Sequence, residues 1–177
     1  MMKQPFLRKS LRKKNSPPTE GLKLQLCCGK DLKQGWVNVD YGNFGQEVKA
    51  DLNKRWGFAK DNSVDYIYCK DGLEHLESAV HFLSECGRIL KKGGIAEIIV
   101  PHFKNPSAYH ITHHQWFSWR GFQRYPLPTE KSDLKLIQNK LIIEDNIPPL
   151  NWLANISPVW WEKFFYVCGL HLKFRKS

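Results

Sequence analysis

The amino-acid sequence predicts an α/β fold built on a mostly parallel sheet, and three observations lead to this prediction. Residues 64–69 and 95–100 are short β-branched, aromatic or apolar runs, as expected of buried strands. The residues between these runs carry apolar side chains at helical spacing. Two buried strands joined by one helix form a βαβ unit, in which the strands run parallel.

The connecting helix is expected to begin at Asp71 and to end at Gly93 or Gly94. Asp71 is a favourable N-cap residue, and Glu74 follows three positions later as in a capping box. Two lysines before the glycines suit the negative end of the helix dipole, and glycine is the usual left-handed stop. The predicted buried face consists of Leu73, Leu76, Val80, Leu83, Gly87 and Leu90.

Three short strands are expected before this unit, at residues 22–27, 36–39 and 47–50. Only six residues separate Gly29 from Trp36. A usual crossover helix needs about a dozen residues, so the first crossover is predicted to be shortened to a loop or a single turn.

The C-terminal part is expected to add two paired, antiparallel terminal strands at residues 134–144 and 169–174. Between them, residues 147–158 form a proline-broken stretch, and residues 159–168 have the pattern of an aromatic-rich helix. Helices are therefore expected to flank a sheet whose last strands are antiparallel.

The composition is that of an ordinary soluble domain, with 177 residues, 42% hydrophobic and 25% charged. No run approaches the roughly 18 apolar residues of a membrane span, and no signal-peptide core is present. Five cysteines without framework spacing indicate reduced thiols. These features favour a cytoplasmic protein.

The net charge of +10 is concentrated at the start of the chain, where six of the first fourteen residues are basic. Residues 1–21 are expected to form a flexible basic segment ahead of a single domain at residues 22–177. Such a segment can contact nucleic acid or an anionic lipid surface, although a solvated tail is the simpler interpretation.

Polar and glycine positions follow successive predicted strands, where an open α/β sheet binds its ligand. Gly29 follows the first strand, Asp40 ends the second, Asp51 ends the third, and Asp71 follows the fourth. A glycine lets backbone approach a ligand closely, and a carboxylate can accept both hydroxyl groups of a ribose. The set predicts a site shaped for a nucleoside.

Three stretches, LKLQLCCGKDLKQGWVNVDYG, ADLNKRWGFAKDNSVDYIYCKDGLEHL and ECGRILKKGGIAEIIVP, resemble class I S-adenosylmethionine-dependent methyltransferases, a Rossmann-like family. The similarity is greatest to the small type-11-like branch. The tail, NKLIIEDNIPPLNWLANISPVWWEKFFYVCGLHLKF, resembles a subgroup often encoded among surface-polysaccharide genes. The resemblance covers nearly everything from residue 22 onward.

The resemblance implies S-adenosyl-L-methionine as the cofactor and gives each strand end a role. The loop after the first strand holds the methionine part, Asp40 binds the ribose, and the pair after the third strand borders adenine. The segment at residues 69–71 faces the cofactor beneath the substrate. The cofactor-binding residues implied are Cys27, Cys28, Gly29, Asp40, Asp51, Leu52, Cys69 and Asp71.

Two departures from the family pattern favour an alternative, a catalytically degenerate binding protein with the same fold. Cys27 replaces the usual first glycine of the loop, where a side chain can crowd the cofactor. Lys70 stands where serine or histidine is usual, and its charge opposes that of a sulfonium.

Residues 102–128 form an irregular insertion rich in histidine and aromatic residues, which favours a functional role. His102, directly after the fifth strand, is the first choice for a catalytic base, and His75 is the second. The spacing of His110, His113 and His114 suits a metal, but no carboxylate or cysteine is near in sequence, so no metal is expected. The insertion's aromatic residues can stack on a sugar ring or cover the sheet edge.

The sequence therefore predicts an enzyme that transfers a methyl group from S-adenosylmethionine to a small-molecule or glycan-type acceptor. Besides the degenerate binding protein, a nucleic-acid methyltransferase stays open as an alternative because of the basic N-terminus.

Overall fold

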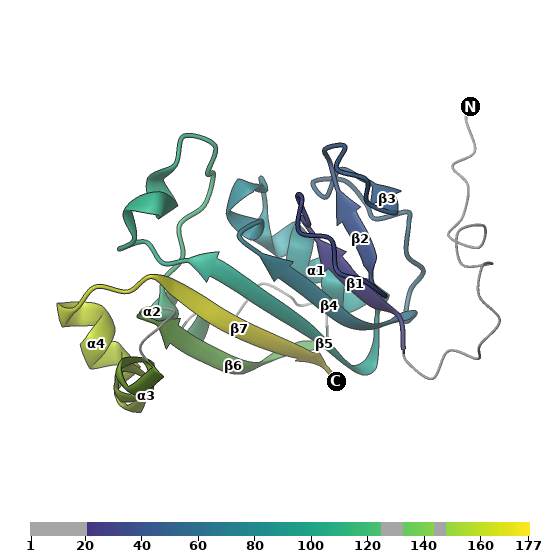
Figure 1. The fold of residues 1–177 in the computed structure, drawn as a ribbon. Coiled ribbons are helices and arrows are strands. Elements are labelled where there is room, and N and C mark those ends of the chain that lie inside the picture. Colours follow the sequence, from purple (N-terminus) through teal and green to yellow (C-terminus); the bar gives the residue numbers. More distant parts are fainter. Residues whose placement is uncertain (1–20, 125–132, 144–147) are drawn as a thin grey trace.

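A computed structural model describes residues 21–124, 133–143 and 148–177 of the chain (Figure 1). The expected N-terminal segment therefore lies outside the described residues except for Gly21. The same holds for residues 125–128 of the insertion and for residue 144 of the expected strand.

The described residues form one seven-stranded sheet in the order β3-β2-β1-β4-β5-β7-β6. The strands are β1 (Lys23–Leu26), β2 (Val37–Asp40), β3 (Val48–Lys49), β4 (Val64–Lys70), β5 (Leu90–Pro101), β6 (Leu134–Ile142) and β7 (Gly169–Lys176). The first five strands pair in parallel, whereas β7 runs antiparallel to both β5 and β6. The predicted fold class is confirmed, including its antiparallel terminal strands.

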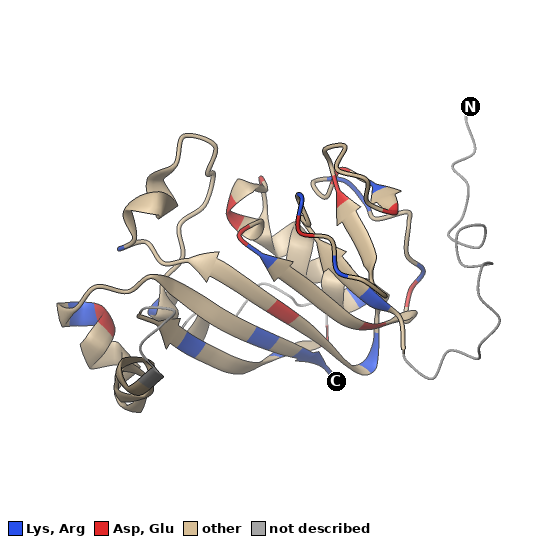
Figure 2. Ribbon diagram, in the orientation of Figure 1, with Lys and Arg blue, Asp and Glu red and all other residues tan. Residues whose placement is uncertain are grey.

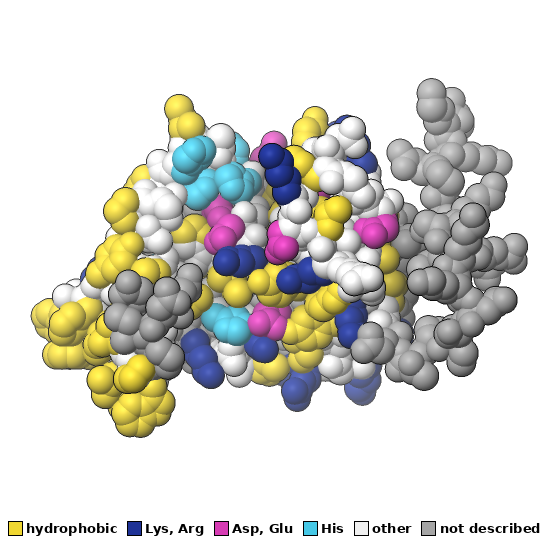
Figure 3. Space-filling model, in the orientation of Figure 1, with side chains coloured by type: hydrophobic (Ala, Val, Ile, Leu, Met, Phe, Trp, Pro, Cys, Tyr) yellow, Lys and Arg dark blue, Asp and Glu magenta, His cyan; other side chains and the backbone are white. Residues whose placement is uncertain are grey.

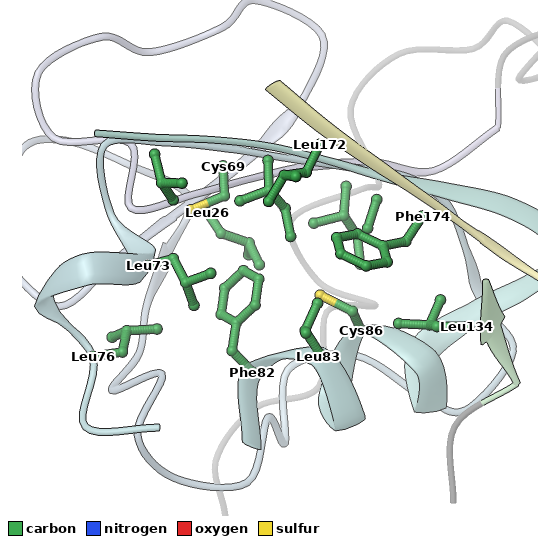
Figure 4. Close-up of a cluster of buried hydrophobic side chains, with 14 of the residues drawn as sticks. Leu26, Cys69, Leu73, Leu76, Phe82, Leu83, Cys86, Leu134, Leu172 and Phe174 are labelled. Atoms are coloured by element: carbon green, nitrogen blue, oxygen red, sulfur yellow. The ribbon is translucent and has the colours of Figure 1, made fainter. Parts of the chain in front are cut away.

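The main core lies between the sheet and α1 (Ala79–Ile89), with α2 (Trp119–Arg124) on the same face (Figure 1). Figure 4 shows Phe82, Leu83 and Cys86 of α1 pointing toward strand residues such as Leu26 and Leu172. Each of these side chains is at most 1% exposed. Burying one Leu or Phe side chain contributes about 1.5–3 kcal/mol, so this layer holds the strand ends in place.

The first crossover is a loop rather than a helix, as its length predicted. Buried polar side chains hold this loop in place. Gln25 and Asn38 are almost fully buried. Both side-chain carbonyls accept hydrogen bonds from the Lys33 N–H, at 3.2 and 2.9 Å. Glu47 accepts two hydrogen bonds from Asn38, one from its backbone and one from its side chain. This network holds the loop against β1 and β2.

The helix after β4 begins later than the capping pattern predicted. The Asp71 N–H donates to the Ile99 carbonyl of β5 at 3.0 Å, and Asp71 has a φ of 50°. A short 3₁₀ turn, η1 (Leu73–His75), follows, and α1 starts only after Ser78, whose side chain accepts from the His81 N–H. The expected capping role of Asp71 is therefore wrong, because Ser78 caps α1 and Asp71 has a left-handed backbone rather than the extended backbone of an N-cap.

The later start also changes the buried face and the end of the helix. Val80 is 41% exposed, whereas the other five predicted residues are buried. Phe82, Cys86 and Ile89 are buried as well. The chain enters β5 directly at Leu90, so the predicted glycine stop is wrong. Residues 91–94 form a bulge in the β4–β5 pairing, and Gly93 has a φ of 80° there.

The stretch expected to be proline-broken is mainly helical. It forms α3 (Pro148–Ile156), because both prolines fall in the first turn, where a missing N–H costs nothing. Asn155 of α3 accepts from the Leu141 N–H and donates to its carbonyl, each at 2.9 Å. The following helix, α4 (Pro158–Phe164), ends before residue 168. In the part of the chain that the structure describes, no helix has both the length and the apolarity to cross a membrane.

Candidate active site

Asp40 lies at the centre of the carboxyl edge of β1 and β2. Its two carboxylate oxygens accept hydrogen bonds from the Gly29 N–H at 2.9 Å and from the Gly42 N–H at 2.8 Å. The Ala50 N–H donates to the Asp40 carbonyl at 2.9 Å, which brings in the third strand. The structure therefore brings together three of the strand ends that the sequence predicted to meet.

The turn after β3 is only partly arranged as predicted. Asp51 accepts from the Asn53 N–H at 3.1 Å and pairs with Lys54 at 3.2 Å. The Asn53 hydrogen bond is the main cause that lowers the Asp51 pKa. Leu52 is 4% exposed and belongs to the hydrophobic core. Because the core holds the Leu52 side chain, the predicted position of this pair beside adenine would involve Asp51 and the backbone of Leu52.

The cysteines at this edge pack against one another and against Gly72. Cys27 has a φ of 52°, and a Cβ placed on Gly72 would lie 2.4 Å from the Cβ of Cys27 and 3.1 Å from the Sγ of Cys69. Cys69 is fully buried, and its hydrogen bond with Cys27, followed by burial, raises its pKa well above the ordinary value. Burial and the nearby Asp40 raise the pKa of Cys28 to about 11. Cys28 and Cys69 are therefore neutral thiols near pH 7.

A cleft of about 530 Å³ opens beside this edge, over the ends of β4 and β5. Its walls include Lys70, Asp71, Glu74, His75, Ile99, Val100, Pro101, Asn105, Ser107, His110, His113, Ile142, Cys168 and Gly169. Figure 3 shows histidine side chains gathered beside acidic ones on this face of the molecule. The cleft joins the end of β4 to the irregular insertion, so the insertion forms one side of the candidate site.

Glu74 has an unusual environment in this cleft. It is 1% exposed, and burial is the main cause that raises its pKa to about 7. Burial, and then the neighbouring His113, lower the pKa of His75. The rings of His75 and His113 meet edge to face, with centroids 4.5 Å apart. The sequence predicted only a capping role for Glu74, because its approach to His113 depends on the tertiary fold.

His102 has a structural position rather than the catalytic one that the sequence suggested. Its side chain is 0% exposed, its Nε2 lies 2.9 Å from the Glu162 carboxylate, and its Nδ1 accepts from the Lys104 N–H. Because both ring nitrogens are engaged in the interior, His102 has no access to a substrate in this structure. Burial is the main cause that lowers its pKa, against an opposing effect of Glu162.

The aromatic residues of the insertion divide into two groups. Phe117 and Phe122 are buried and stack on each other, so they cover the sheet. Tyr109 and Trp116 are more than half exposed and line a second open cleft of about 530 Å³ with Phe103, Phe117 and Ser118.

Comparison with known proteins finds one matching family model and several solved structures with a similar fold. The methyltransferase domain family model matches residues 23–98. A SAM-dependent methyltransferase from Archaeoglobus fulgidus has a TM-score of 0.61 at 14% identity, covering 88% of this chain and 86% of that one. An S-adenosylmethionine-dependent methyltransferase from Mesorhizobium loti has a TM-score of 0.57 at 14% identity, with coverages of 87% and 90%. No curated protein matches the sequence.

A third structure with this fold was solved with ligands. It is the geranyl diphosphate C-methyltransferase of Streptomyces coelicolor, in complex with Mg²⁺, geranyl diphosphate and S-adenosyl-L-homocysteine. Its TM-score is 0.60 at 13% identity, with 89% of this chain and 72% of that chain covered. The family match over residues 23–98 and the shared fold agree with the resemblance to class I S-adenosylmethionine-dependent methyltransferases of the type-11 branch.

Proposed function

We propose that the Asp40 edge binds S-adenosylmethionine and that the adjoining cleft presents a small-molecule or glycan-type acceptor for methylation. The observation that carries this proposal is the carboxylate of Asp40, held by two backbone N–H groups between Gly29 and Gly42. A carboxylate has about four acceptor positions, so two stay available for the two hydroxyls of a ribose.

The residues around Asp40 fit an adenosyl group. A Cβ placed on Gly29 would have no heavy atom within 4 Å, so the glycine faces open space that a ligand can occupy. Cys27 lies against Gly72 and Cys69, which supports a loop whose side chain is turned toward the protein. The neutral thiols present no charge that competes with the cofactor.

When bound, the cofactor supplies a methyl group activated by positively charged sulfur. The protein must then align the acceptor with this group and exclude water, which can lower the barrier by up to about 7–11 kcal/mol. Transfer to a hydroxyl also requires removal of its proton. The cleft is lined by His75, His110 and His113 but not by His102. One of these three histidines is therefore the proposed proton acceptor.

The cleft linings favour a hydroxyl-rich acceptor. Asn105, Ser107 and Lys70 offer polar side chains at the end of the sheet. Tyr109 follows Ser107 by two residues, and its exposed ring and that of Trp116 line the second cleft, which suits stacking on a sugar ring. These features support the glycan-type class over an apolar acceptor.

Calorimetry with S-adenosylhomocysteine tests the cofactor site directly. Asp40→Asn removes the charge while keeping the size, and loss of a charged hydrogen bond costs about 1.5–3 kcal/mol. We therefore expect the affinity to fall by roughly 10-fold to 150-fold. Asp61→Asn is the matched control, because Asp61 is an exposed carboxylate in the turn before β4, and it should leave the affinity unchanged. Equal affinities of the Asp40→Asn and wild-type proteins would refute the proposed ribose contact.

A further inference from the structure

Three potential metal ligands converge in the cleft from two separate segments. Glu74 and His75 come from η1, and His113 comes from the insertion. One ligand atom of each residue lies within 4.8 Å of those of the other two. The His114 N–H donates to the Glu74 carbonyl at 2.8 Å, so backbone contact fixes the two segments against each other.

Hydrogen bonds orient both imidazoles for ligation. The Nδ1 of His113 lies 3.0 Å from the Ala108 carbonyl, which only accepts, so this Nδ1 carries the hydrogen and Nε2 keeps its lone pair. The Nδ1 of His75 lies 3.3 Å from the Thr112 carbonyl and 3.1 Å from the Thr112 hydroxyl oxygen. Both oxygens can accept a hydrogen from this Nδ1, which leaves Nε2 free to bind a metal. Metal-binding histidines in proteins are held in this way, with the second ring nitrogen donating to a carbonyl or carboxylate.

The carboxylate of Glu74 provides an independent observation. Glu74 is 1% exposed, and its Oε2 is buried without a hydrogen-bond partner in the structure. A buried polar oxygen without a partner costs about 1–3 kcal/mol, and more when it is charged. A cation bound between this oxygen and the two imidazoles would remove that cost.

We propose that Glu74, His75 and His113 bind a divalent transition metal of the zinc class at the acceptor side of the cleft. Two imidazoles and one carboxylate form a ligand set of catalytic zinc sites, which keep a further position open. Ligand atoms around a tetrahedral zinc ion lie about 3.4 Å apart, given bonds of about 2.0–2.1 Å. The ligand atoms, now within 4.8 Å of one another, would have to draw closer to reach that geometry.

In the proposed methyl transfer, the metal would activate a hydroxyl of the acceptor. This catalytic role rests on the proposed function, whereas metal binding itself does not. A metal held by these residues would lower the pKa of an acceptor hydroxyl bound to it, so that the O–H bond would break and the proton would pass to solvent or to His110, the cleft histidine outside the ligand set. The oxygen would then bond to the methyl carbon as the bond from carbon to sulfur breaks, leaving the sulfur neutral. No other reactant is needed.

Metal binding can be measured without knowing the acceptor. We would titrate the metal-free protein with Co²⁺, following its visible absorption, and with Zn²⁺ by calorimetry. We expect one equivalent to bind, with a Co²⁺ spectrum of low coordination number. Glu74→Gln and His113→Ala should each weaken binding by about 10-fold to 100-fold or more, since even outer-shell partners of metal ligands have effects of that size.

His114→Ala is the matched control. It removes an exposed imidazole next to His113 that is not in the cluster, and it should leave the affinity within about twofold of wild type. Zn²⁺ should also raise the unfolding temperature of the wild type and of His114→Ala but not of His113→Ala. Glu74→Gln preserves shape, so a folded Glu74→Gln variant keeps the test valid if His113→Ala is unstable.

Two results would overturn the metal site: no saturable binding by the wild type, or equal weakening by His113→Ala and His114→Ala. S-adenosylhomocysteine binding is measured separately with the Asp40 variant. Loss of the metal site with intact cofactor binding therefore refutes this inference alone, and intact metal binding with no cofactor binding refutes the proposed function alone.

Discussion

Cys27 and Asp71 both hold left-handed backbone conformations at the carboxyl edge of the sheet, with φ values of 52° and 50°. Such conformations cost a residue with a side chain about 1–2 kcal/mol. They persist where surrounding contacts determine them, and they occur often at functional sites. Here the contacts are the Asp71 hydrogen bond to β5 and the sulfur packing around Cys27.

Gly72 is the residue on which this packing depends most directly. We expect Gly72→Ala to lower the free energy of unfolding by about 1–3 kcal/mol, the usual cost of overpacking. The physical reason is that the new methyl group would lie 2.4 Å from the Cβ and 2.6 Å from the Sγ of Cys27. Urea denaturation of the two proteins measures the effect.

A double-mutant cycle separates this clash from other causes. Cys27→Gly removes both clashing atoms and relieves the positive φ, so the double variant should recover about 1 kcal/mol or more relative to the additive expectation. The Sγ of Cys69, at 3.1 Å, needs only a small shift. Additive effects of the two substitutions would show that the contact between Cys27 and Gly72 is not the cause.

At the scale of elements, hydrogen bonds to the buried carboxylate of Glu162 join β5, α2 and α4. Glu162 of α4 accepts hydrogen bonds from the His102 ring after β5 and from the Trp119 N–H at the start of α2. Since Nδ1 of His102 accepts from the Lys104 N–H, the hydrogen on the neutral ring is at Nε2, facing Glu162. This contact places the insertion and the terminal helices relative to the sheet.

The pH dependence of the free energy of unfolding should depend on this contact between His102 and Glu162. The pKa of His102 is lowered in the folded protein, mainly by burial. Between its folded pKa and the unfolded value of about 6.5, the unfolded chain binds more protons, so stability rises with pH. We expect the His102 contribution to be complete above about pH 6.5 and to be lost as the pH falls through that window.

Thermal unfolding of the wild type and of His102→Gln measures the contribution. The difference in unfolding temperature between the two proteins should be largest near neutral pH and should shrink on acidification. A constant difference across the window would mean that His102 does not titrate with folding. Comparing the two proteins cancels the contributions of the other histidines.

Local sequence patterns predict the strands, but they do not predict where α1 begins or which residues meet in the cleft. The strands and their order follow from apolar runs and short connections, as with the β4–α1–β5 unit. The start of α1 does not, because the contact of Asp71 with Ile99 of β5 accompanies a left-handed backbone that is unsuited to a cap, and Ser78 caps the helix instead. The meeting of Glu74 with His113 likewise depends on how the insertion folds back over η1.

At the scale of the whole molecule, basic residues are most concentrated along the sequence in the first twenty residues, outside the described part of the chain, whereas acidic residues mark the candidate site. Residues 1–20 carry six basic residues and one acidic residue, whereas the other residues carry 21 and 16. Figure 2 shows acidic residues near the ends of β2 and β4, where Asp40 and Asp71 lie. A carboxylate-rich edge attracts a sulfonium or a metal cation and disfavours a polyphosphate. This distribution favours a small or glycan-type acceptor over nucleic acid.

Deleting residues 1–14 tests this separation. We expect the shortened chain to bind S-adenosylhomocysteine within about twofold of the full chain, and to show no saturable binding of an RNA or DNA oligonucleotide at roughly 0.15 M salt, where weak charge contacts are screened. Any oligonucleotide binding by the full chain should then come from the removed lysines and arginines and fall steeply with salt. A nucleic-acid methyltransferase behaves differently, because its site must contact the phosphate backbone as well. Oligonucleotide binding that persists after the deletion and takes place in the acceptor cleft would therefore contradict the proposed small or glycan-type acceptor and favour a nucleic-acid substrate.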